Sequence, residues 1–154
     1  MQRILISACF LGENVRYNGI IKSLEHHLIK QWQNENRLVP ICPEVIGGLS
    51  TPRAPAEYNR QYGKVITMTG IDVSSAFELG AKKALELCQK HQIKIALLKE
   101  YSPSCGSNMI YDGSFSQRKI IGSGVTTTLL RKNKIRVYSE ENIDLLLEEL
   151  NDYD

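Results

Sequence analysis

The sequence has few of the residues that define several special classes of protein. Its 154 residues include only four cysteines and five prolines, and aromatic residues make up 7%. Four cysteines are too few for a fold built on disulfides, and the low proline content opposes a disordered or fibrous chain. With 42% hydrophobic and 23% charged residues, the composition is that of a globular protein. We expect one domain over residues 1–154.

Long apolar runs are also missing. No stretch approaches the ~18 consecutive apolar residues that a membrane-spanning helix needs. The run at residues 4–12 is short, has no small-residue cleavage pattern and is followed at once by Glu13 and Arg16. It therefore predicts a buried strand rather than a secretion signal. We expect a cytoplasmic protein that makes no use of a membrane.

Strand-like and helix-like patterns alternate along the chain. Short apolar and β-branched runs have the length of strands, and helical patterns separate them. These runs are residues 3–8, 38–41, 94–98 and 135–139. Such alternation is typical of a parallel sheet with helices on both faces. The predicted fold is α/β and Rossmann-like, with three layers and about four core strands.

The helical segments carry recognisable start signals. Ser23 can cap a helix that runs to about Asn34, Asp72 can cap residues 73–90, and Ser139 can cap residues 140–150. A shorter helix is expected at residues 124–131. The stretches 42–72 and 101–124 are rich in loop residues, and the first contains a candidate hairpin around Gly63. Long loops in compact proteins often carry function, so we expect the chemistry there.

Three of the four cysteines follow predicted strands. Cys9 follows the first strand, Cys42 follows the second, and Cys105 lies in the loop after the third. Ligands of open parallel sheets bind beyond the carboxyl ends of the strands, so these thiols can meet at one edge. Cys88 instead falls on the apolar stripe of a helix, which predicts a buried structural residue. Three thiolates leave one coordination position open on a zinc ion or on an iron–sulfur cluster.

The residues around these cysteines form characteristic strings. They are Cys-Phe-Leu-Gly at residues 9–12, Cys-Pro-Glu-Val-Ile-Gly-Gly at residues 42–48 and Ser-Pro-Ser-Cys-Gly at residues 102–106. On these motifs the sequence resembles the thiouracil desulfidase-like family, and the resemblance covers nearly the whole chain. It implies a [4Fe–4S] cluster held by Cys9, Cys42 and Cys105, with one iron left without a protein ligand. It further implies non-redox removal of sulfur from a thiolated pyrimidine or a related thiocarbonyl compound.

The resemblance also implies roles for two residues next to the ligands. Glu44 and Ser102 match the functional glutamate and serine of the family. A ring carbon that loses sulfur must be attacked by water, and Glu44 is placed to act as the general base. The alternative for Glu44 is a loop carboxylate that caps a neighbouring helix or pairs with Arg53.

Further candidates concern the substrate. Ser102 would orient it, and Arg53, Lys99 and Ser104 are candidates for binding it. The expected substrate is a small thiolated base or nucleoside, and a thiolated RNA stays open as a further substrate. The sequence does not indicate an oligomeric state.

Two other functions remain open from the residues alone. A cysteine-nucleophile phosphatase would also place a thiol after the first strand, but six residues separate Cys9 from Arg16 and the glycine-rich phosphate loop is missing. A non-catalytic metal or redox sensor would use the same three thiols for zinc or a labile cluster. The acid beside the middle cysteine favours catalysis.

Overall fold

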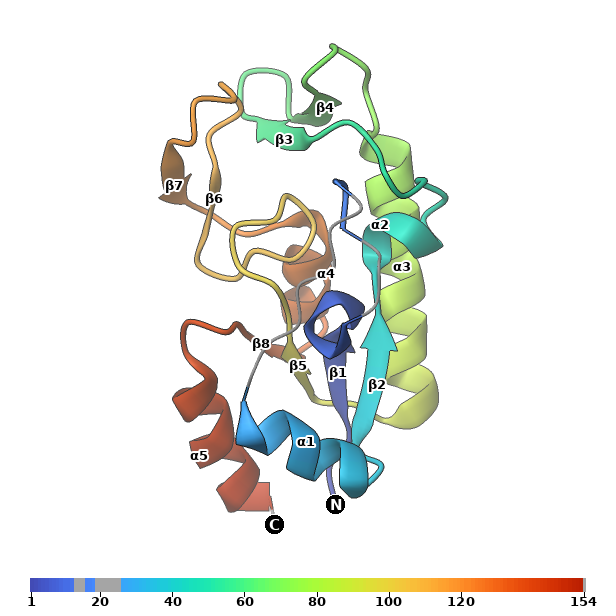
Figure 1. Ribbon diagram of the computed structural model, residues 1–154, viewed down its shortest axis with the longest axis vertical. Helices are drawn as coiled ribbons and strands as arrows, with labels where there is room; N and C mark the ends of the chain where they lie inside the picture. Colours follow the sequence, from blue (N-terminus) through green and yellow to red (C-terminus); the bar gives the residue numbers. More distant parts are fainter. Residues whose placement is uncertain (13–15, 19–25, 154) are drawn as a thin grey trace.

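A parallel sheet of four strands forms the centre of the fold (Figure 1). In the computed structural model, which describes residues 1–12, 16–18 and 26–153, the strand order is β2-β1-β5-β8. The strands are β1 (Ile4–Ser7), β2 (Leu38–Ile41), β5 (Ile95–Leu97) and β8 (Arg136–Tyr138). All neighbours in this sheet are parallel. The predicted α/β fold is confirmed, and all four predicted core strands are present within one residue at each end.

The position of each strand in the sheet follows from its residues. In β1, Ile4, Leu5 and Ile6 are completely buried, as expected for a central strand that is covered on both faces. In β2, Pro40 pairs with Ile6 in the register. Proline has no N–H to donate to a further neighbour, so it suits an edge strand, and β2 is an edge strand.

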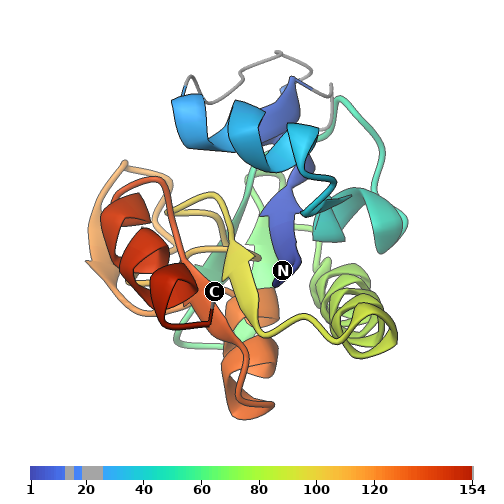
Figure 2. The same ribbon diagram turned by 90° about the horizontal axis from the view of Figure 1, so that it is seen from below.

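Helices cover both faces of the sheet and give three layers (Figure 2). One face packs on α1 (His27–Asn34) and α5 (Ile143–Tyr153), and the other on α3 (Ser74–His91) and α4 (Val125–Lys132). Successive side chains of β1 point to opposite faces of the sheet, so neighbouring residues pack against different helical layers. Ile4 and Ile6 pack in the core with α1 and α5, whereas Leu5 packs in the core with α3 and α4.

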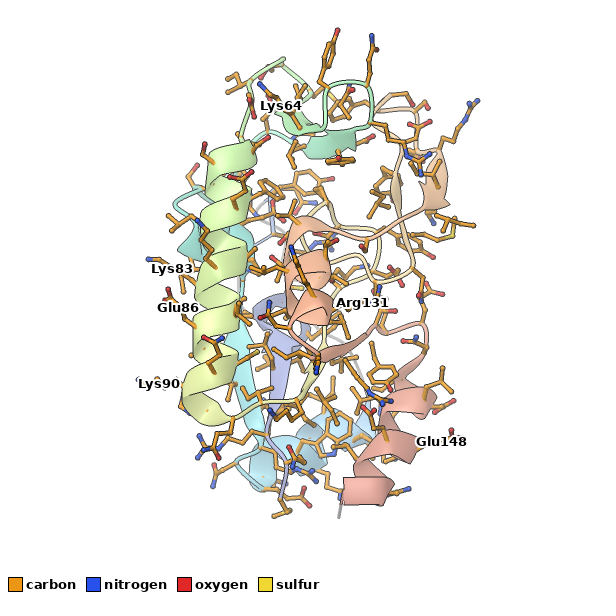
Figure 3. All side chains as sticks on the ribbon, turned by 180° about the vertical axis from the view of Figure 1, so that it is seen from behind. Lys64, Lys83, Glu86, Lys90, Arg131 and Glu148 are labelled. Atoms are coloured by element: carbon orange, nitrogen blue, oxygen red, sulfur yellow. The ribbon has the colours of Figure 1, made fainter. Side chains whose placement is uncertain are left out.

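The longest helix, α3, is amphipathic. Ala81, Ala84 and Cys88 are buried, whereas Lys83 and Lys90 lie on the outward side of the helix in Figure 3. No helix among residues 1–12, 16–18 and 26–153 is long and apolar enough to cross a membrane.

The starts of all four predicted helices differ from the predictions. The predicted cap Ser23 lies outside the described residues, and α1 begins at His27, where the Nδ1 atom of His26 accepts a hydrogen bond from the Leu28 N–H (3.2 Å). The helix predicted at residues 73–90 is α3, shifted by one residue at each end. Asp72 still accepts a hydrogen bond from the N–H of Ser74 (2.9 Å). The predicted segment 124–131 is α4, which begins and ends one residue later.

The prediction that Ser139 caps a helix over residues 140–150 was wrong in its start, because α5 begins only at Ile143. The Ser139 hydroxyl accepts a hydrogen bond from the Glu141 N–H (3.1 Å) but donates its own proton to Glu100 (3.0 Å). Glu140 accepts a hydrogen bond from the N–H of Glu100 (2.7 Å). These hydrogen bonds hold residues 139–141 against Glu100, which lies just after β5. The helix therefore starts after them.

Two antiparallel hairpins lie beyond the carboxyl ends of the parallel strands (Figure 1). The predicted hairpin around Gly63 is confirmed as β3 (Ala56–Asn59) and β4 (Lys64–Thr67). A second hairpin, β6 (Met109–Tyr111) and β7 (Lys119–Ile121), was not predicted. Glu57 joins the two, because its Oε1 atom accepts hydrogen bonds from the N–H groups of Gly113 (2.9 Å) and Phe115 (3.2 Å).

Candidate functional site

A cavity of about 470 Å³ opens where β1, β2 and β5 end, and both hairpins contribute to its wall. Seven of the eight residues predicted for the site line it. They are Cys9, Cys42, Glu44, Arg53, Lys99, Ser102 and Cys105. The eighth, Ser104, does not. Residues far apart in the sequence therefore share one enclosure because parallel strands end at the same edge of the sheet.

Cys9 lies in a short 3-10 helix, η1 (Ala8–Leu11), directly after β1. Gly12 ends this turn with a φ of 84° and donates its N–H to the Cys9 carbonyl (3.3 Å). Glycine adopts this left-handed conformation without strain, which lets the chain reverse within four residues. Cys9 is thereby held at the end of a buried strand, and 8% of its surface is exposed.

Cys42 immediately precedes α2 (Pro43–Ile46) and is the N-cap residue of this single helical turn. Pro43 occupies the first helical position, where a missing N–H costs nothing. The backbone N–H groups of Glu44 and Val45 favour the thiolate form of Cys42 and oppose part of the rise in its pKa that burial causes. The α2 turn also packs tightly on α3, since a Cβ atom at Gly80 would collide with the carbonyl of Pro43.

Cys105 is pinned within its loop by hydrogen bonds on both sides of the residue. Its N–H donates to the Ser102 hydroxyl (3.1 Å), and its carbonyl accepts from the Thr127 hydroxyl in α4 (2.8 Å). Gly124 lies so close to the backbone of Ser104 that no larger residue fits there. The start of α4 therefore fixes the loop, and Cys105 is only 5% exposed.

None of the four cysteines forms a disulfide, and burial favours the protonated form of each thiol. Burial, with a smaller contribution from Cys42, raises the pKa of Cys9 to about 11. It also raises the pKa values of Cys42 and Cys105, and for Cys105 the neighbouring Cys42 adds to the effect. Raised pKa values oppose a cysteine-nucleophile phosphatase, which needs a thiolate at neutral pH. A bound metal would displace these protons.

The fourth cysteine is apart from this group. Cys88 is buried on α3 among apolar residues and does not line the cavity. Burial alone raises its pKa to about 12. None of the histidines, all of which lie within the described residues, lines the cavity either.

The donor set fits an iron–sulfur cluster better than a single metal ion. Among residues 1–12, 16–18 and 26–153, no three Cys, His, Asp or Glu side chains lie close enough together to bind one ion. A cluster places each thiolate on a different iron, so its ligands lie farther apart than those of zinc. Three cysteine thiols line the cavity, and among the described residues no fourth joins them, which suits a cluster that keeps one open iron.

Glu44 follows Cys42 by two residues, and the structure pairs it with Arg53 at the cavity. Its carboxylate lines the cavity, and it also accepts a hydrogen bond from Arg53 Nε (3.2 Å). Arg53 is itself fixed by hydrogen bonds to the Ser50 carbonyl (2.9 Å) and the Thr51 hydroxyl (3.1 Å). Burial raises the pKa of Glu44, whereas Arg53 opposes the rise. A carboxyl group whose pKa is raised by burial and lowered by a neighbouring arginine is suited to accept and release a proton.

The other predicted substrate contacts have different surroundings. Lys99 Nζ pairs with Glu140 (2.6 Å) at the cavity wall. The Ser102 oxygen accepts the N–H groups of Ser104 (3.0 Å) and Cys105, which leaves its proton to be donated. Ser104 is fully buried and its hydroxyl bonds that of Thr126 (2.8 Å). The structure therefore does not bring Ser104 to the cavity.

Four aromatic residues on the cavity wall were not predicted to belong to the site. Tyr17, Tyr101, Tyr111 and Phe115 line the cavity. The Tyr101 and Tyr111 rings lie 6.2 Å apart, and the ammonium of Lys119 lies 3.8 Å from the Tyr101 ring centre. No periodicity marks these residues, because they come from separate loops and the unpredicted hairpin. Flat apolar walls suit a planar ring.

Fold and site together define an α/β protein with three cysteine thiols in one cavity at the carboxyl edge of its sheet. The chain belongs to the 2-thiouracil desulfurase family, whose family model matches residues 4–142. The resemblance noted in the sequence is thus confirmed.

Two relatives support this assignment. The chain is 41% identical over 152 residues to the uncharacterized protein YbbK of Bacillus subtilis (strain 168), covering 94% of this chain and 99% of that protein. A solved structure of the [4Fe-4S]-dependent thiouracil desulfidase TudS is 46% identical, covers 98% of this chain and 99% of its own, and superposes with a TM-score of 0.94.

Proposed function

We propose that this protein removes sulfur from thiouracil or a closely related thiolated pyrimidine with the aid of a [4Fe–4S] cluster held by Cys9, Cys42 and Cys105. The observation that carries the proposal is that three cysteines outside disulfides and a glutamate line a single cavity. The similarity to TudS over almost the whole of both chains supports the same chemistry. Cysteines outside disulfides are typical of a reducing compartment, so we place the protein in the cytoplasm.

The reaction needs water and no electrons. The oxygen of a water molecule replaces the sulfur, so a carbon–oxygen bond forms, the carbon–sulfur bond breaks, and uracil and sulfide are released. When bound, the cluster supplies an open iron as a Lewis acid for the soft thiocarbonyl sulfur.

Glu44 is the proposed proton carrier. Its carboxylate takes a proton from the attacking water and returns it to the ring nitrogen or to the departing sulfide. Arg53 keeps the carboxylate in place through the hydrogen bond from Nε, and the contacts of Arg53 with Ser50 and Thr51 prevent both side chains from swinging away. Glu44 follows Cys42 by two residues in the α2 turn, and both residues line the same cavity.

Other residues of the cavity orient the substrate. Ser102 has one hydroxyl proton to donate to a ring oxygen or nitrogen. Lys99 provides a positive charge at a fixed place, because Glu140 holds it. The aromatic walls enclose a planar ring, and the cavity of about 470 Å³ is large enough for a nucleoside as well as a free base.

Release of uracil and sulfide tests the proposal. Protein reconstituted anaerobically with iron and sulfide should convert 2-thiouracil or 4-thiouracil into uracil, with one sulfide for each uracil. The thiolated nucleosides and a thiolated transfer RNA, assayed in parallel, decide the form of the substrate. Protein carried through the same procedure without iron is the control. No release from any of these compounds would contradict the proposed function and favour a metal or redox sensor.

A further inference from the structure

Glu100 stands at the start of the loop that carries Cys105, and its side chain folds back onto the other end of that loop. Its Oε1 atom accepts hydrogen bonds from the N–H groups of Ser107 (2.7 Å) and Asn108 (3.1 Å). The same atom accepts a longer hydrogen bond from Tyr101 (3.3 Å), the first residue of the loop. One carboxylate oxygen thus joins the entry and the exit of the loop.

The second carboxylate oxygen extends this connection to the sheet. Oε2 accepts hydrogen bonds from the hydroxyl groups of Ser107 (2.9 Å) and Ser139 (3.0 Å). Ser139 follows β8, which pairs with β5. From the other side, Arg131 at the end of α4 (Figure 3) donates to the Ser107 carbonyl. The exit of the loop is therefore tied to two neighbouring elements.

The environment of Glu100 is unusual for a charged group. Only 3% of the residue is exposed, and among the described residues it forms no ion pair. Burial alone would raise the pKa of Glu100, but the hydrogen bonds from Asn108, Ser107 and Ser139 outweigh it and hold the pKa below its usual value. A buried carboxylate is costly unless its acceptors are satisfied, so this arrangement depends on the closed form of the loop.

We infer that Glu100 is a positioning residue for Cys105. Its hydrogen bonds join the two ends of the 101–109 loop and so direct the Cys105 thiol to the cavity. The link to cluster binding rests on the proposed function. The effect of Glu100 on the position of the Cys105 thiol does not rest on the proposed function, because that effect follows from hydrogen bonds within the chain. Glu100 acts here through the backbone and not on the substrate.

Accessibility of the thiols in the metal-free, full-length protein tests this inference. In Glu100→Ala, alkylation of Cys105 by iodoacetamide should accelerate by roughly tenfold to a hundredfold, the range that corresponds to leaving a buried hydrogen-bonding group without its partner. Mass spectrometry of peptides gives the rate for each cysteine separately. Cys88 serves as the internal reference and should accelerate less than about twofold, because local opening of the loop leaves α3 intact.

Two further variants separate positioning from a general loss of stability. Glu149→Ala removes another buried acid, which pairs with Arg136 away from the cavity, and should leave the ratio of Cys105 to Cys88 labelling unchanged. In Glu100→Gln, labelling of Cys105 should return to the slow rate of the wild type. Its amide oxygen can accept from the backbone N–H groups, and its amino group can donate to the two serine hydroxyls.

Cluster content gives the second readout. After anaerobic reconstitution, Glu100→Ala should retain as little iron as Cys105→Ala although all its cysteines are present, and Glu149→Ala should match the wild type. If the wild type itself binds no iron, the proposed function fails, and the labelling rates still decide the role of Glu100.

The inference is overturned if Cys105 labelling in Glu100→Ala equals that of the wild type, or if Cys88 accelerates as much as Cys105. If circular dichroism shows that Glu100→Ala is unfolded, Ser139→Ala takes its place, since it removes only one of the hydrogen bonds to Oε2. It should still accelerate Cys105 labelling selectively, and unchanged labelling would again overturn the inference.

Discussion

Replacing Glu44 by glutamine is expected to lower the single-turnover rate of sulfide release by about 10²–10⁴-fold, the usual loss when a general acid–base group is removed. The amide has nearly the shape of the carboxyl group and still accepts the hydrogen bond from Arg53, so the cavity wall should keep its form. It cannot take a proton from water. Iron content and the affinity for thiouracil should therefore stay close to those of the wild type, and only turnover should fall.

The rates are compared at equal iron content, with sulfide and uracil measured in the same quenched samples. Glu149→Gln is the matched control, because it neutralises a buried acid that does not line the cavity. This control should react at the wild-type rate. Equal rates for Glu44→Gln and the wild type would reject Glu44 as the proton carrier.

The cysteine variants should separate into two groups by their iron content. Alanine at Cys9, Cys42 or Cys105 should reduce the iron from about four atoms per chain to well below one, because two thiolates do not retain a cubane cluster. Cys88→Ala should keep the full iron content. It removes a small buried side chain from the core around α3 and should cost about 1 kcal/mol in the free energy of unfolding.

Iron is determined after anaerobic reconstitution, and urea denaturation of each metal-free variant checks that it is folded. All four variants make the same substitution, so a nonspecific effect of losing sulfur would appear in Cys88→Ala too. Loss of the cluster in Cys88→Ala, or its retention in any of the other three, would overturn the proposed ligand set.

The core of the fold could be predicted because its signals are local. The apolar run of β1 has the length of a buried strand, and the apolar stripe of α3 has the period of a helix. The topological rule for parallel sheets then placed Cys9, Cys42 and Cys105 at one edge, which the cavity lining matches.

The remaining features depend on contacts between distant residues. The start of α5 shifted because Glu100, forty residues before Glu140, binds the segment after β8. The β6–β7 hairpin lies in a segment rich in loop residues, and Glu57 of the other hairpin holds it in place. Ser104 lies beside Cys105 in the sequence, yet the close approach of Gly124 directs it into the core.

The iron and acid-labile sulfide content of the wild-type protein, purified and reconstituted without oxygen, tests the central claim most directly. A cluster held by three thiolates predicts a brown protein with about four irons and about four sulfides per chain. Zinc in place of iron, or thiols that bind neither metal after careful reconstitution, would contradict it.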